Sequence, residues 1–164
     1  MAWNKDEGAL VRWLGFSSED LVKINDIELT TLKIHLVLED ALKCLLASRL
    51  KTNEDVFFDS SIGFKTLVEI ALAGVTNDHL RGALRSLNTA RNQMSHCVES
   101  NEFNEKLEIF VREIGYMLGR KTVWPADLNE RLRLLREAFD DAAYEIFDIA
   151  INGLHVECQR QPGA

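Results

Sequence analysis

Apolar residues recur every three or four positions through most of the chain, which is the spacing of an amphipathic helix and not the alternation of a strand. Proline, which interrupts helices, is almost absent from the interior. The pattern predicts an all-α protein, an up-and-down bundle of about five main helices joined by short connections. These helices are expected at residues 26–50, 61–73, 77–95, 102–118 and 128–152.

Polar and small residues at the ends of these segments predict where the helices start and stop. Gly74 stands where a glycine would end the second helix, and Thr76 can cap the third. Asp127, with Glu130 three residues later, forms a capping-box-like start for the last helix. We expect that helix to stop at Asn152-Gly153.

Three parts of the chain follow from these boundaries. A helical bundle is expected at 26–153, after an N-terminal extension (1–25) with one or two short helices and before a C-terminal tail (154–164). The first bundle helix is apolar on most sides, as expected of one at the centre of a bundle. The extension is rich in large apolar residues, which would mark a partner surface if they stayed exposed. These residues are Trp3, Leu10, Trp13, Leu14 and Phe16.

Length and charge narrow the class of protein. A chain of 164 residues with a net charge of −7 describes one acidic domain that is large enough to bury a core. The negative charge argues against nucleic acid covering the whole surface, because such binding depends on neutralising phosphates. A single basic groove remains compatible with it.

The cysteines and the N-terminus indicate the compartment. Cys44, Cys97 and Cys158 include no CxxC pair and cannot all pair within a monomer, so we expect free thiols and a reducing environment. The N-terminus lacks a basic start followed by an apolar run, and no segment approaches the roughly 20 apolar residues of a membrane helix. We therefore expect a cytoplasmic protein that does not contact membranes.

The third predicted helix carries the candidate chemistry. On a helical projection its leucines occupy one arc, and polar residues occupy another. The polar arc contains Asp78, Arg81, Arg85, Asn88, Asn92 and His96. This locally positive face could hold a phosphate chain, with Arg81, Arg85 and Asn88 as RNA-binding residues. The alternative is a solvated face whose arginines pair with acids elsewhere.

Arg91 falls inside the leucine arc, where a long cation needs an acceptor. The expected acceptor is Glu39 in the apolar first helix, which shares a helix face with His35 four residues earlier. A buried Glu39–Arg91 ion pair could serve only to join two helices, and this structural role stands beside a functional one.

The run from Leu87 to His96 resembles the signature of the HEPN superfamily of helical nucleic-acid-processing proteins, in which Arg and a polar residue precede three variable positions and His. Here Arg91, Asn92 and His96 fill those positions, and a Leu-Glu-x-x-Leu pattern around Glu39 lies upstream. The stretch from Phe64 to His96 is also similar to the mannitol-repressor-like branch.

This resemblance implies a homodimer whose two Arg-His motifs meet at a cleft and, in catalytic members, a metal-independent endoribonuclease. It implies that His96 is the general base, Arg91 the phosphate clamp and Asn92 the residue that orients the imidazole. Glu39 would position Arg91, with His35 as a further supporting group. A toxin or defence ribonuclease with an RNA substrate and an antitoxin-like partner is the resulting hypothesis.

A second hypothesis is a non-catalytic member of the same fold, a regulator that binds a protein or nucleic acid. The sequence departs from catalytic members because Cys97-Val98 follow His96 where an aromatic residue often stands. On an unbroken helix, Arg91 and His96 would also point about 140° apart. They converge only if the helix ends or distorts near Ser95, or if a partner subunit supplies one of them.

Two His/Cys pairs, His96-Cys97 and His155-x-x-Cys158, have the right ligand types for zinc, but their spacing is poor. We expect no metal and no cofactor.

Overall fold

The computed structural model describes residues 18–53, 55–58, 61–94 and 101–159, together with the side chains of most of them but not of 153–159. The described residues form helices without a strand, which confirms the all-α prediction. In chain order these helices are α2 (Ser18–Val22), α3 (Ile27–Leu50), α4 (Asp55–Phe58), α5 (Phe64–Ala71), α6 (Asp78–Gln93), α7 (Asn101–Met117) and α8 (Leu128–Gln159).

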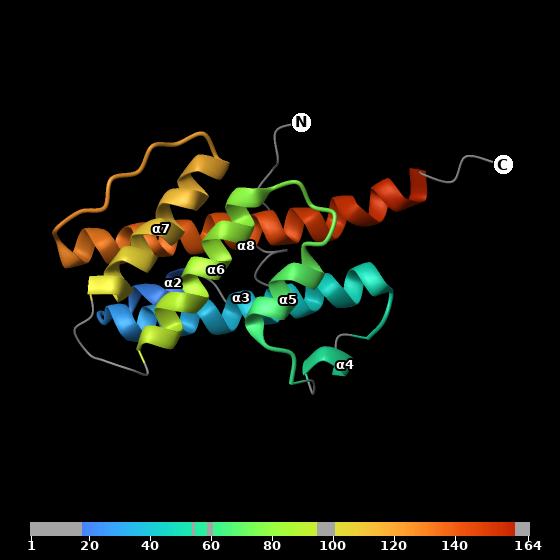
Figure 1. Cartoon of the computed structure of the whole chain (residues 1–164), viewed down its shortest axis with the longest axis horizontal. Helices are drawn as coiled ribbons and strands as arrows, with labels where there is room; N and C mark the ends of the chain where they lie inside the picture. The colour runs from blue at the N-terminus through green and yellow to red at the C-terminus, as the bar shows by residue number, and fades with distance from the viewer. Residues whose placement is uncertain (1–17, 54, 59–60, 95–100, 160–164) are drawn as a thin grey trace.

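Two long helices run along the length of the molecule, and the others pack on them. Figure 1 shows α3 and α8 lying along the long axis, with α6 and α7 crossing in front of them. The most extensive contact is between α6 and α7, and α6 also packs on α3 and α5. The residues of α6 thus face both α3 and α5.

The core lies where the apolar stripes of these helices meet. On α6 the predicted leucine stripe is fully buried, which agrees with its helical spacing. Burying each such side chain stabilises the fold by about 1.5–3 kcal/mol. The largest fully buried side chains include Ile34, Leu38 and Leu42 of α3, Leu80, Leu84 and Leu87 of α6, Phe110 of α7 and Phe139 of α8.

Several predicted helix boundaries are confirmed, and one cap differs. Asp127 Oδ2 accepts a hydrogen bond of 3.0 Å from the Glu130 amide, as the capping pattern predicts. Gly74 has a φ of +76°, a left-handed conformation that suits glycine, but α5 spans Phe64–Ala71 and is therefore shorter at both ends than the predicted 61–73. The cap of α6 is Asn77 and not Thr76, because the Asn77 Oδ1 atom accepts from the Leu80 amide at 3.2 Å.

The predicted end of the last helix is wrong. α8 continues through Asn152-Gly153 to Gln159. A single glycine costs a helix only about 1 kcal/mol, which a helix of this length tolerates. α4 was also not predicted, because four residues are too few to show a period. None of the described helices combines the length and the apolar run needed to cross a bilayer.

α3 is less enclosed than its composition suggests. Leu29 and Leu36 are 44% and 47% exposed, and Leu50 at the end of the helix is 60% exposed. The expectation that the helix is apolar on most sides because it is surrounded by others is therefore only partly right. The buried side of α3 is the one that faces α5, α6 and α8.

Candidate functional site

Polar residues of α3 and α6 meet on the side of α3 that α6 covers. Most of the site residues predicted from the sequence lie here, on two adjoining helices that pack closely. We call this group the α3–α6 polar cluster. It consists of His35, Glu39 and Lys43 from α3 and of Asn88, Arg91 and Asn92 from α6.

His35 connects the two helices. Its side chain is buried, with 4% of the residue exposed, and its Nε2 atom lies 3.2 Å from Asn88 Oδ1. The ring also lies against Phe64 of α5, with 4.2 Å between the ring centroids. One imidazole therefore contacts residues of α5 and α6 from its position on α3.

The surroundings of His35 favour the neutral ring. Burial lowers the pKa of His35 below its ordinary value of 6.5, and the positive charge of Arg91 also lowers it. The Asn88 hydrogen bond and the Glu39 carboxylate act in the opposite direction, but the pKa is lowered in sum. His35 is thus a neutral hydrogen-bonding group near pH 7.

Glu39 pairs within its own helix. Its Oε1 atom lies 2.9 Å from Lys43 Nζ, and its Oε2 atom lies 3.9 Å from His35 Nδ1. Sequence reasoning missed Lys43, although its position four residues after Glu39 is the usual spacing of a helical ion pair. The Lys43 side chain is only 11% exposed, so Glu39 compensates a largely buried charge.

The expected buried Glu39–Arg91 ion pair is wrong. Arg91 is exposed, and Glu39 contacts Lys43 and His35 instead. The helical projection places Arg91 among the leucines, but the residue lies in the last turn of α6, just after the buried Ala90. A long arginine side chain at a helix end can reach water even when its Cα lies above the core.

Arg91 also differs from the other described arginines in its contacts. Its guanidinium donates a hydrogen bond of 3.2 Å to the neutral Asn92 Oδ1, and no described carboxylate lies within ion-pairing distance. All other arginines in the described ranges reach a carboxylate or a backbone carbonyl. Arg91 therefore offers donors and positive charge to an external anion.

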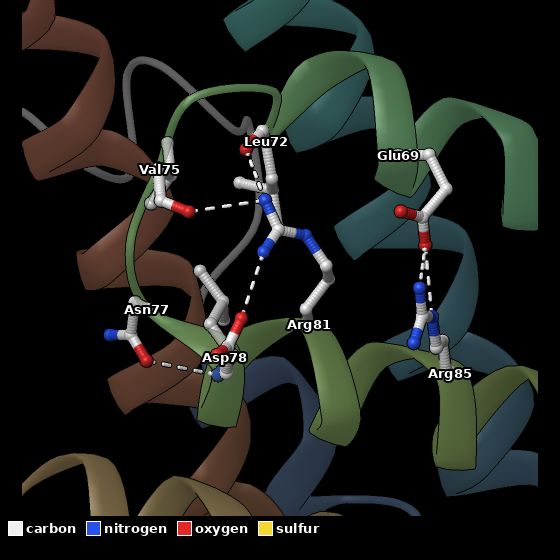
Figure 2. Close-up of polar contacts among 8 residues, drawn as sticks. Glu69, Leu72, Val75, Asn77, Asp78, Arg81 and Arg85 are labelled. Carbon is white, nitrogen blue, oxygen red and sulfur yellow. Dashed lines mark hydrogen bonds and ion pairs between the residues drawn. The ribbon is translucent and has the colours of Figure 1, made fainter.

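Arg81 is engaged inside the protein, as Figure 2 shows. Its Nη2 atom donates to the carbonyls of Leu72 and Val75 at 2.6 and 3.1 Å, and its Nη1 atom lies 3.1 Å from Asp78 Oδ1. These contacts hold the turn between α5 and α6 against the first turn of α6.

Arg85 pairs with Glu69 of α5, with Nη2 2.5 Å and Nε 2.9 Å from the same carboxylate oxygen (Figure 2). Both side chains are about half exposed. The acids that the sequence left open as partners of Arg81 and Arg85 are therefore Asp78 and Glu69. Both arginines lie apart from the α3–α6 polar cluster in their contacts.

His96, Cys97 and the aromatic residues of the N-terminal extension lie outside the described residues, as do the side chains of His155 and Cys158. α6 ends at Gln93, before Ser95. Within the described part of the chain, no group of three His, Cys, Asp or Glu side chains could hold a metal ion.

Comparisons of this chain with models of protein families, with curated proteins and with solved structures gave no match.

Proposed function

We propose that this protein is a HEPN-like, metal-independent endoribonuclease, a toxin or defence enzyme that binds RNA phosphates at the end of α6. Arg91 is the phosphate clamp, Asn92 supports it, and His96 is the general base in this proposal. Asn88, His35 and Glu39 hold the two helices in register around them. The proposal extends to the up-and-down order of about five main helices that the hydrophobic pattern predicts.

The observation that supports it most is the state of Arg91. An exposed guanidinium without a carboxylate partner among the described residues keeps most of its donors for a ligand. The amide of Asn92 lies directly beside it. A planar guanidinium whose partner in the described part of the chain is an amide is well suited to a phosphate, which accepts two parallel hydrogen bonds from it.

The chemistry follows from the side chains. His96 would take the proton from a ribose 2′-hydroxyl, whose oxygen then attacks the adjacent phosphorus. The bond from phosphorus to the 2′-oxygen forms as the bond to the 5′-oxygen breaks, and that oxygen takes up a proton from water. The products are a 2′,3′-cyclic phosphate and a 5′-hydroxyl. Arg91 would stabilise the negative charge that builds up on the phosphoryl oxygens.

A cleavage assay tests the enzymatic part of the proposal. Purified protein should cut labelled RNA in the presence of EDTA, and His96→Ala should lower the rate at least about a hundredfold, the usual contribution of a general base. A DNA oligonucleotide of the same sequence should stay intact, because it lacks the attacking 2′-hydroxyl. If the wild-type protein binds RNA and does not cut it, the non-catalytic regulator is the correct alternative.

The homodimer belongs to the same proposal and has its own measurement. Light scattering should give about twice the mass of the 164-residue chain, because two Arg-His motifs are needed at one cleft. A strict monomer at all concentrations would contradict the shared cleft. An antitoxin or regulatory protein is the further partner that this class of function implies.

A further inference from the structure

One ring nitrogen of the buried His35 has no hydrogen-bond partner among the described residues. The Asn88 amide oxygen can only accept, so the His35 Nε2 atom bonded to it carries the proton of the neutral ring. Nδ1 is then unprotonated, and it is buried without a partner. Its nearest charged neighbour is the Glu39 Oε2 atom at 3.9 Å, which is also an acceptor. Two hydrogen-bond acceptors, His35 Nδ1 and Glu39 Oε2, thus lie 3.9 Å apart, and a proton on Nδ1 would allow a hydrogen bond between them.

The charges around this gap come from two helices. On α3 the Glu39 carboxylate lies between His35 and the cation of Lys43. On α6, Arg91 lies one helical turn after Asn88 and adds positive charge, while α5 contributes the uncharged ring of Phe64. Glu39 favours a proton on Nδ1, and Arg91 opposes it.

We propose that binding of an RNA phosphodiester at Arg91 is coupled to protonation of His35, so that the site takes up a proton when it binds RNA. The inference rests on the proposed function, since it needs an anion at Arg91. It makes RNA binding at Arg91 dependent on pH. His35 is then a positioning residue whose protonation responds to the bound RNA.

The coupling has a simple electrostatic cause. Burial is the main reason that His35 is neutral, and the positive charge of Arg91 adds to it. A bound phosphodiester neutralises the charge of Arg91 and so removes this added repulsion, which favours the protonated ring. The new proton on Nδ1 points at Glu39, and a charge-assisted hydrogen bond forms when the carboxylate moves by about 1 Å. Because linkage is reciprocal, acidic conditions strengthen binding by the same factor by which binding favours the proton.

The first test measures binding against pH with a 2′-O-methylated RNA oligonucleotide, which cannot be cleaved and whose phosphodiesters do not titrate in this range. Between about pH 8 and about pH 5.5, fluorescence anisotropy should show the affinity of the wild type rising about tenfold more than that of His35→Gln. Equal pH dependence in the two proteins would overturn the coupling and leave the proposed function intact.

A second measurement needs no ligand and works if His35→Gln fails to fold. Arg91→Gln changes an exposed residue, so nuclear magnetic resonance titration of the His35 imidazole in that variant should give a higher midpoint than in the wild type. Arg85→Gln, which removes an equal charge that Glu69 already compensates, should leave the midpoint unchanged. An unchanged midpoint in Arg91→Gln would overturn the coupling. No oligonucleotide binding at any pH would overturn the proposed function, and the coupling with it.

Discussion

Three arginines of α6 use the same side chain in different ways. Arg81 donates to backbone carbonyls and closes the turn before the helix, Arg85 pairs with an acid on α5, and Arg91 remains open to solvent. The sequence places Arg81 and Arg85 on the polar arc of this helix and Arg91 among its leucines, but it does not show their partners. What distinguishes them is the position of acceptors on other elements, which the helical period does not contain.

Replacing Arg81 should destabilise the fold more than replacing Arg85. Arg81→Met leaves the Leu72 and Val75 carbonyls without their donor, and its side chain is only 18% exposed. We expect a loss of about 1–3 kcal/mol in the free energy of unfolding, as for hydrogen bonds to a charged group. Arg85→Met should cost under about 1 kcal/mol, because its ion pair is half exposed. Urea denaturation of both variants measures the difference. Equal losses of unfolding free energy would contradict the role of Arg81 in holding the turn between α5 and α6.

His35 should make stability depend on pH. Its pKa is lowered in the folded protein by burial first, so the unfolded chain binds the proton more readily. The stability that the neutral ring contributes is complete above the unfolded pKa of about 6.5 and decreases as the pH falls toward the folded value. His35→Gln should lose this part of the slope. The measurement is urea denaturation between about pH 8 and about pH 5, and a variant with the wild-type slope would disprove this role.

At the scale of helices, most of the architecture could be predicted from the sequence because local spacing determines it. The buried leucines of α6 and the Asp127 cap depend only on residues within a few positions of each other. The end of α8 could not be predicted in this way, because Asn152-Gly153 resembles a helix stop and yet the helix continues through it. Local signals define preferences of about 1 kcal/mol, and the rest of the helix can override one of them.

The candidate site was only partly predictable for a related reason. The spacing of His35 and Glu39 on one helix indicated their shared face, and the Arg91 motif indicated the end of α6. The bond between His35 and Asn88 depends on how α6 lies against α3, and this register is not written in either helix alone. The helical projection also lacks this register, and for that reason it predicts a buried Arg91 where the side chain is exposed.

The close approach of α7 to the connection after it gives a test at this scale. A Cβ atom at Gly115 would lie 2.6 Å from Thr122 Oγ1 and 3.1 Å from the Arg120 carbonyl oxygen. Gly115→Ala should therefore cost about 1–3 kcal/mol, because the Thr122 side chain must move away and the Arg120 carbonyl must shift slightly. Gly82→Ala on α6 is the matched control, since its Cβ meets Glu113 at an ordinary 3.7 Å and should stabilise the helix by up to about 1 kcal/mol. Thermal unfolding of both variants measures these changes in stability. An unchanged stability of Gly115→Ala would show that the contact is not tight.

For the molecule as a whole, the net charge of −7 limits where an anion can bind. An acidic surface repels RNA in general, so binding must be concentrated where a cation is not compensated. Arg91 meets that condition in the described structure, whereas Arg85, Arg120 and Arg133 are paired with acids. An acidic protein in which Arg91 is the open arginine of the described residues is therefore compatible with a small, local RNA site.

The central claim is that this open arginine is the contact for RNA, and one pair of dissociation constants tests it most directly. Arg91→Gln and Arg85→Gln remove the same charge from the same helix, but only Arg91 is without a carboxylate among the described residues. For the uncleavable 2′-O-methylated oligonucleotide, we expect Arg91→Gln to raise the dissociation constant about 10- to 100-fold, as for loss of a charged hydrogen bond. Arg85→Gln should change it less than about threefold. Equal effects of the two substitutions, or no effect of Arg91→Gln, would contradict the account.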